Sequence, residues 1–328
     1  MSKLEDRLPK STFAHTPVLL GEVLDFLKPE TTCSDPDARC IMVDGTCGEG
    51  GHAEAFLSRY NNICLLCVDA DKEQITSARE RLQRFGSRVK LFTMWFADFF
   101  ADYHKYNSKL PDRILLDLGI SRFHYEKSGR GFSFQKDEYL DMRLDKERKH
   151  TAYDIVNKAS EQELINILRE YGEERFANAI AKAICRERKN MRIRTSAQLA
   201  RIVSKAVPQQ SQKRRIHPAT KTFQALRIAV NGELSELERG LAAGFAVLKK
   251  GGRIAVISFH SLEDRIVKRF FKGKNKSCTC PPEWPICRCR GEKELILLTK
   301  KPITPGNAEV RANPAARSAK LRVVEKCA

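Results

Sequence analysis

The sequence predicts an α/β fold in which a mostly parallel sheet is interrupted by a helical insertion. Apolar runs typical of buried strands alternate with helical patterns up to about Gly131. The chain then reads as helices from 136 to 210, and strand patterns return after that stretch. Strands that alternate with helices form parallel sheets covered on both faces. We therefore expect an N-terminal extension (1–14), one discontinuous α/β domain (15–131 plus 221–328) and a helical insertion (132–220).

Local patterns identify the individual elements. Short apolar runs predict strands over 41–44, 63–69, 89–93 and 113–118, and helical spacing predicts helices over 51–60 and 72–85. Ser160 and Glu163 form a capping-box pattern, which predicts the start of a helix within the insertion. After the insertion we expect one or two helices over 220–248, a strand over 253–258, a helix over 261–271 and a closing antiparallel pair at 295–299 and 321–325.

The basic charge is concentrated in two stretches. The chain carries a formal charge of +18, of which residues 182–220 contribute +10 and residues 265–328 contribute +11, so the remainder is slightly acidic. Clustered lysines and arginines neutralise the phosphates of nucleic acids. This distribution favours a nucleic-acid partner, and the alternative is a basic surface that is merely solvated.

Other features of the composition exclude whole classes of protein. The chain has no run of about 18 apolar residues, so we expect no membrane span. Its charged start lacks the apolar core of a signal peptide, so we expect a cytoplasmic protein. Eleven cysteines in such a chain indicate reduced thiols or metal ligands, and disulfides are not expected.

A glycine-rich turn at 44–52 follows the first predicted strand and opens the first helix. Glycines let the backbone approach a ligand closely, and the amides of a helix N-terminus can bind its anionic group. The acid that ends the next strand, Asp69, lies 21 residues after Gly48, where a carboxylate can accept hydrogen bonds from ribose hydroxyls. The pattern predicts an adenosine-ligand site, and a tight structural turn is the alternative.

Two observations favour S-adenosylmethionine over a nicotinamide dinucleotide. Asp44 directly precedes the first glycine, where its carboxylate can meet a ligand ammonium group. Phe96 and Asp98 follow the third strand, where an aromatic ring and an acid can meet an adenine. Phe96 can equally be a core residue.

Several sequence blocks then point to one family. The chain resembles the bacterial 16S rRNA cytosine-N4 methyltransferases, with the blocks in the family's order over nearly all of the chain from His15. No single block is specific, but together they are. The blocks lie at 15–20, 44–52, 115–121, 130–134, 140–143, 171–176, 217–225, 257–265 and 313–318.

This resemblance implies a class I (Rossmann-like) S-adenosylmethionine-dependent methyltransferase sheet with an inserted all-helical domain. It implies S-adenosylmethionine as the methyl donor and a cytidine in the decoding region of 16S rRNA as the acceptor. The small ribosomal subunit is then the expected partner, the basic insertion the expected RNA-substrate domain, and a homodimer stays open. Matching positions assign cofactor contacts to Gly50, Gly51, His52, Asp69, Phe96 and Asp117.

The chain departs from the family at one of these positions. The family continues after Gly119-Ile120-Ser121 with Ser-Pro-Gln, and that Gln contacts the cofactor. Here the stretch reads Arg122-Phe123-His124. His124 takes the Gln position and can still donate or accept a hydrogen bond, so we expect it at the cofactor.

The expected reaction is direct displacement, in which an exocyclic cytosine amine attacks the sulfonium methyl carbon. The lone pair of that amine is delocalised into the ring, so alignment and a hydrogen-bond acceptor on its N–H are needed. Asp117, at the carboxyl end of its strand, is the catalytic candidate for positioning the amine. A carboxylate that serves only the cofactor or the fold is the alternative.

Further candidates lie near the same edge of the sheet. His260, at a strand-to-helix turn, and His217 are candidates for substrate contact, and capping of the helix by Ser261 is the alternative at that turn. The aromatic rings near the insertion can stack on a flipped base or pack the insertion against the sheet. These rings are Phe123, Phe132 and Phe134.

Two C-x-C pairs form the only cysteine cluster of the sequence. Four thiolates so close together can hold a structural Zn²⁺, and a reduced loop or reversible thiol chemistry is the alternative. Since related sequences lack these cysteines in some cases, catalysis should not depend on them. The cysteines are Cys278, Cys280, Cys287 and Cys289.

Two other functions remain as alternatives. One is a different adenosine-cofactor enzyme, such as another S-adenosylmethionine-dependent RNA methyltransferase, a small-molecule methyltransferase or a nicotinamide oxidoreductase. The other is a non-catalytic ribosome assembly factor, against which the glycine-rich turn with Asp69 and Asp117 argues.

Overall fold

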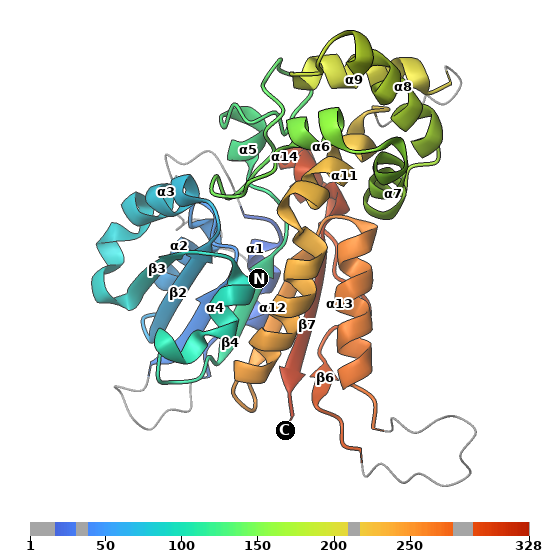
Figure 1. Ribbon diagram of the computed structural model, residues 1–328. Helices are drawn as coiled ribbons and strands as arrows, with labels where there is room; N and C mark the ends of the chain where they lie inside the picture. The colour runs from blue at the N-terminus through green and yellow to red at the C-terminus, as the bar shows by residue number, and fades with distance from the viewer. Residues whose placement is uncertain (1–16, 31–38, 209–216, 278–290, 328) are drawn as a thin grey trace, which may run out of the picture.

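The computed structural model describes residues 17–30, 39–208, 217–277 and 291–327, and it confirms the α/β fold with a helical insertion (Figure 1). Seven strands form one sheet in the order β3-β2-β1-β4-β5-β7-β6. The first five run parallel, and β7 lies antiparallel between β5 and β6. They are β1 (Cys40–Asp44), β2 (Ile63–Asp69), β3 (Val89–Thr93), β4 (Arg113–Asp117), β5 (Arg253–Ser258), β6 (Leu295–Leu297) and β7 (Lys320–Lys326).

Both faces of the sheet are buried, because successive side chains of a strand point to opposite sides. In β1, Met42 belongs to one apolar cluster and its neighbour Val43 to another. The first cluster includes α1 (Leu20–Phe26), α2 (Gly51–Arg59) and α3 (Lys72–Leu82). The second includes α4 (Phe96–Ala101), α12 (Glu233–Val247) and α13 (Ser261–Lys274). This explains why the central strands read as continuous apolar runs.

The insertion has an apolar core of its own, which gathers buried residues from Phe132 to Val230. Three of its helices begin with complete capping boxes, at Thr151, Ser160 and Thr195, and the one at Ser160 confirms the sequence pattern. Among the described residues, the helices between β4 and α12 are α5 (Arg122–Glu126), α6 (Ala152–Lys158), α7 (Glu161–Gly172), α8 (Ala177–Asn190), α9 (Ser196–Ala206) and α11 (Thr220–Asn231).

The predicted helical stretch over 220–248 forms two helices. They meet at Gly232, whose left-handed φ of 62° ends α11 before α12 begins. Phe223 and Leu226 of α11 belong to the apolar core of the insertion. Helix α11 therefore extends that core beyond residue 220, whereas α12 covers the sheet.

The last part of the chain completes the sheet. The predicted closing pair is present as the antiparallel strands β6 and β7. Helix α14 (Asn307–Ala312) and the 3-10 turn η3 (Pro314–Ser318) precede β7, and two further 3-10 turns are η1 (Gln83–Arg88) and η2 (Tyr103–Lys105). Among the residues described, none of the helices combines the length and the apolar character that crossing a membrane requires.

Candidate active site

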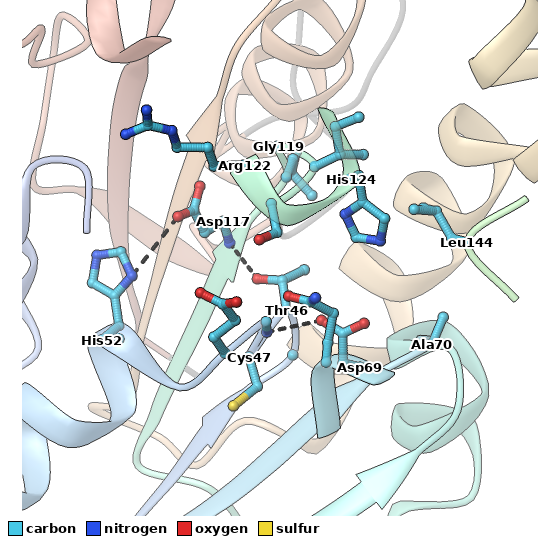
Figure 2. Close-up of a pocket in the computed structure, with 18 of the residues that line it drawn as sticks. Thr46, Cys47, His52, Asp69, Ala70, Asp117, Gly119, Arg122, His124 and Leu144 are labelled. Atoms are coloured by element: carbon cyan, nitrogen blue, oxygen red, sulfur yellow. Dashed lines mark hydrogen bonds and ion pairs between the residues drawn. The ribbon is translucent and has the colours of Figure 1, made fainter. Parts of the chain in front are cut away.

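A cavity of about 240 Å³ opens where the parallel strands end. Its lining includes the residues that end or directly follow four strands: Gly45 after β1, Asp69 of β2, Asp117 of β4 and Phe259 after β5. Ligands of open α/β sheets bind at this edge. Figure 2 shows Thr46, Asp69 and Asp117 close together, although they come from segments far apart in the sequence.

The glycine-rich turn forms one wall. Gly48 and Gly50 have left-handed φ angles of 54° and 82°, which turn the chain from β1 into α2. A Cβ on Gly51 would lie 2.8 Å from a side-chain carbon of Pro17, so only glycine fits there. Gly51 and His52 line the cavity. Gly50 lies behind it, where its Cα faces Leu82 of α3.

Asp69 holds the turn in place. One carboxylate oxygen accepts the backbone N–H of Gly48 at 2.8 Å, and the other accepts that of Asp71 at 2.9 Å. Burial raises the pKa of Asp69, and these two N–H groups oppose that shift. Because a carboxylate oxygen has two lone pairs, each oxygen can still accept a hydroxyl of a ribose.

Asp117 is an acid of the cavity with a strongly raised pKa. Burial, together with the nearby carboxylates of Asp44 and Glu263, raises its pKa to about 8. Its Oδ1 is buried without a hydrogen-bond partner, and its Oδ2 lies 3.7 Å from Nδ1 of His52. Its backbone N–H donates to the hydroxyl of Thr46, a residue that the sequence had not singled out (Figure 2). When Asp117 is ionised, its unpartnered Oδ1 can accept a hydrogen bond from a ligand group.

Asp44 lies beneath the turn and not in the cavity wall. Only 1% of its surface is exposed, and its carboxylate accepts the backbone N–H of Thr46 at 3.2 Å. Burial raises the pKa of Asp44 to about 7. Asp44 does not line the cavity, and its contact with a ligand ammonium stays a prediction. The negative charge of Asp44 contributes to the raised pKa of Asp117.

His124, on α5, lines the cavity and is only 3% exposed. Its Nε2 lies 2.8 Å from Oδ2 of Asp71, whereas its Nδ1 is buried without a partner. Arg130 also donates to Asp71. The histidine therefore stands at the cavity with one nitrogen engaged and the other free.

Phe96 belongs both to the cavity and to the core. It lines the cavity, is 7% exposed and packs in the apolar cluster with α12. Asp98, which the sequence placed near an adenine, instead pairs with Arg239 at 2.6 Å and is not part of the lining. The aromatic residue beside them, Trp95, does line the cavity and was missed, because nothing in its sequence context separates it from a core residue.

The cavity lining also contains the glutamates Glu233 and Glu263. Their ligand atoms lie within 4.8 Å of one another and of His260. Such a group can hold a metal ion, but Arg227 already makes two hydrogen bonds to Glu233, at 2.8 and 2.9 Å. The guanidinium of Arg227 therefore already places a positive charge beside Glu233. Neither glutamate was predicted, since each occupies the ordinary acidic first turn of a helix.

His260 is part of the helix cap. It is the N-cap of α13, where its Nδ1 accepts the N–H of Glu263 and Glu263 reaches back to the N–H of His260. The proposed capping by Ser261 is wrong, because the Ser261 hydroxyl donates to Glu173 instead. His260 does not line the cavity.

The remaining aromatic candidates pack within the protein. Phe134 stacks on His217 with ring centroids 4.4 Å apart, and Phe132 packs against His124 at 5.2 Å. Phe123, Phe132 and Phe134 do not line the cavity. The four cysteines at 278, 280, 287 and 289 lie outside the described residues. Of the others, Cys47 lines the cavity.

The sheet, the glycine-rich turn and the acids at the strand ends together form the ligand site of a Rossmann-like α/β protein. Comparison with known proteins gives the family. The chain belongs to the MraW methylase family, whose sequence model matches residues 12–327.

Curated relatives match over almost their whole length, and those named here all carry the name ribosomal RNA small subunit methyltransferase H. The protein of Treponema denticola is 52% identical over 95% of this chain and 97% of its own length. That of Citrifermentans bemidjiense is 47% identical over 96% and 99%, and that of Syntrophotalea carbinolica is 46% identical over 97% and 100%. This chain is accordingly an S-adenosylmethionine-dependent methyltransferase.

Proposed function

We propose that this protein transfers a methyl group from S-adenosylmethionine to the exocyclic N4 amine of a cytidine in the decoding region of 16S rRNA. The full-length similarity to relatives named as small-subunit rRNA methyltransferases carries the proposal. The resemblance of the sequence blocks to the cytosine-N4 enzymes supplies the base and the atom.

The cavity fits the cofactor. Its glycine-rich wall leaves backbone amides at the start of α2, and Asp69 keeps lone pairs for ribose hydroxyls. The free oxygen of Asp117 and the free nitrogen of His124 are buried polar atoms that a bound polar ligand would satisfy. Residues that line the cavity and would hold the cofactor are Gly51, His52, Asp69, Phe96, Asp117 and His124. When bound, S-adenosylmethionine supplies an electrophilic methyl group on a sulfonium.

Asp117 is suited to orient the attacking amine. Its Oδ1 can accept one N–H of an exocyclic amine, which draws lone-pair density toward the nitrogen and fixes the direction of attack. Only the ionised carboxylate can do this without donating a proton of its own. With a pKa of about 8 before any ligand binds, Asp117 holds its proton at neutral pH, and a cation bound nearby favours its release.

The insertion offers a surface for the RNA. A groove of about 820 Å³ lies along α8 and α9 and is lined by six cations and two acids. Arg186 is engaged with Glu187 at 3.3 Å. Within the described part of the chain, no carboxylate pairs with the other five cations, which leaves them available for phosphates. They are Lys182, Lys189, Arg192, Arg201 and Lys205.

Purified protein, small ribosomal subunits and S-adenosylmethionine with a labelled methyl group test the proposal. Nucleoside mass spectrometry should find the label in N4-methylcytidine. Label in a different base would indicate another RNA methyltransferase. Binding of subunits without any transfer would indicate an assembly factor.

The proposal also has consequences for location and assembly. A ribosomal substrate implies action in the cytoplasm, where small subunits are assembled. A homodimer stays a prediction, which light scattering of the purified protein tests directly.

A further inference from the structure

His124, a buried residue of the cavity wall, has one ring nitrogen without a hydrogen-bond partner. Nδ1 of His124 is inaccessible to solvent and has no hydrogen-bond partner, while the ring lines the cavity (Figure 2). A buried polar atom without a partner costs free energy comparable to a lost hydrogen bond. A polar group of a ligand bound in the cavity would satisfy this atom.

The hydrogen-bond partner of this ring is Asp71. That residue is 2% exposed, and its Oδ1 accepts the N–H of Glu73 at 2.9 Å as the N-cap of α3. Its Oδ2 lies 2.8 Å from Nε2 of His124 and also accepts from Arg130. Burial alone would raise the pKa of Asp71, but the hydrogen bonds from His124 and Arg130 outweigh it and hold the pKa below its ordinary value.

An ionised carboxylate can only accept hydrogen bonds. Nε2 of His124 must therefore carry the proton that it shares with Asp71, and a neutral ring then presents a bare lone pair at Nδ1. Nδ1 of the ring is then an acceptor, and its tautomer is fixed by Asp71, which does not line the cavity.

We propose that Asp71 holds His124 in the Nε2–H tautomer, so that Nδ1 accepts a hydrogen bond from a donor group of the adenosyl half of the cofactor. His124 is a cofactor-binding residue, and Asp71 is a positioning residue that acts through it. This inference rests on the use of S-adenosylmethionine and adds what the atom recognises: an O–H or N–H donor. The ribose hydroxyls and the adenine amine are the groups of that class.

A double-mutant cycle tests the relay, with the dissociation constant of S-adenosylhomocysteine measured by calorimetry. One hydrogen bond is worth about 3- to 10-fold in affinity. His124→Leu should weaken binding by that factor, and His124→Gln, which keeps an acceptor, should restore most of it. Asp71→Asn should weaken binding similarly in the wild type and have almost no further effect in the His124→Leu background.

The choice of Asn at position 71 provides the control. Asn remains a good N-cap, so α3 keeps its start. Asp71→Asn also alters the contact with Arg130. Any loss of affinity from that change should be equal in both backgrounds and cancel in the double-mutant cycle. Equal losses from Asp71→Asn in both backgrounds would show a purely structural role and overturn the relay. Unchanged binding by His124→Leu would overturn the contact itself.

Two further measurements complete the test. Analogues of S-adenosylhomocysteine that lack one donor at a time identify the group, because the relevant analogue loses affinity for the wild type but not for His124→Leu. The ¹⁵N shifts of His124 in the wild type should show a protonated Nε2 and a bare Nδ1, whether or not the variants fold. The opposite tautomer would contradict the proposal. If the wild type binds no S-adenosylhomocysteine at all, the cofactor assignment itself fails.

Discussion

The carboxylate of Asp69 accepts the backbone N–H of Gly48 at 2.8 Å, which joins the end of β2 to the turn that follows β1. The acid and the glycine-rich turn are thus one unit, although 21 residues separate them. An acid at this point both shapes the turn and presents lone pairs to the cavity. Its loss should affect the cofactor before anything else.

We expect Asp69→Ala to weaken S-adenosylhomocysteine binding at least 10-fold and to abolish methyl transfer. Affinity for RNA should stay nearly unchanged, because the basic groove lies on the insertion. Calorimetry and filter binding measure the two affinities. Asp98→Ala is the matched control, since that acid pairs with Arg239 outside the cavity. Equal effects of both changes would remove Asp69 from the cofactor site.

Asp117→Asn should lower kcat about 100-fold or more, the usual range for a lost proton acceptor. The wild type should gain kcat/KM as pH rises, with an apparent pKa near 8, because the carboxylate must lose its proton before it can accept a hydrogen bond. The residual activity of the variant should lack this dependence. A variant with the wild-type pH profile would assign the titration to another group.

The raised pKa of Asp117 also makes the stability of the folded protein depend on pH. Stability should fall as pH rises, whereas kcat/KM should increase. Folding raises the pKa of Asp117 from about 4 to about 8, so the folded state binds this proton more tightly and loses stability as pH rises between those values. Asp117→Asn should therefore melt a few degrees above the wild type at pH 9 and at nearly the same temperature at pH 4. Calorimetric melting at the two pH values measures the difference. A variant that melts lower at pH 9 would mean that the carboxylate is stabilising.

Three groove lysines should set part of the salt dependence of RNA binding. Each phosphate contact contributes about 0.7 to 0.9 to the slope of log affinity against log salt. Replacing all three with Gln should reduce the slope by about 2, and replacing three exposed cations of the α/β domain should not. The groove set is Lys182, Lys189 and Lys205, and the control set is Arg79, Lys90 and Lys109. Equal slopes for the two sets would place the RNA elsewhere.

Gly240→Ala should disturb the cavity through Phe96. A Cβ at this position would lie 2.1 Å from a ring carbon of Phe96, which must then move within the lining. We expect weaker S-adenosylhomocysteine binding and a lower melting temperature. Gly273→Ala is the control, because nothing lies within 4 Å of its Cβ, and it should stabilise α13 by about 0.5–1 kcal/mol. Normal S-adenosylhomocysteine binding by Gly240→Ala would contradict the assignment of Phe96 as a cofactor contact.

The parts of the fold that could be predicted from sequence are those governed by local pattern. Continuous apolar runs identified β1 and β2, and the residues Ser160 and Glu163 identified a helix start. The boundary between α11 and α12 was less clear, because both sides of Gly232 have helical spacing. The packing of α11 on the insertion depends on tertiary contacts that no local pattern encodes.

The site was predictable where chemistry and topology coincide. The acids Asp69 and Asp117 end parallel strands, and such strand ends meet at one edge of a sheet. Glu263 escaped prediction because a carboxylate in the first turn of a helix is ordinary. The burial of Asp44 and the pairing of Asp98 with Arg239 also depend on distant segments.

Nucleoside mass spectrometry of small-subunit rRNA from cells with and without the gene is the most direct test of the proposed function. We predict that N4-methylcytidine, or its 2′-O-methylated form, disappears from 16S rRNA when the gene is absent and returns with the wild-type gene. The Asp69→Ala gene should not restore it. Persistence of the mark in cells that lack the gene would contradict the assignment of this cytidine as the substrate.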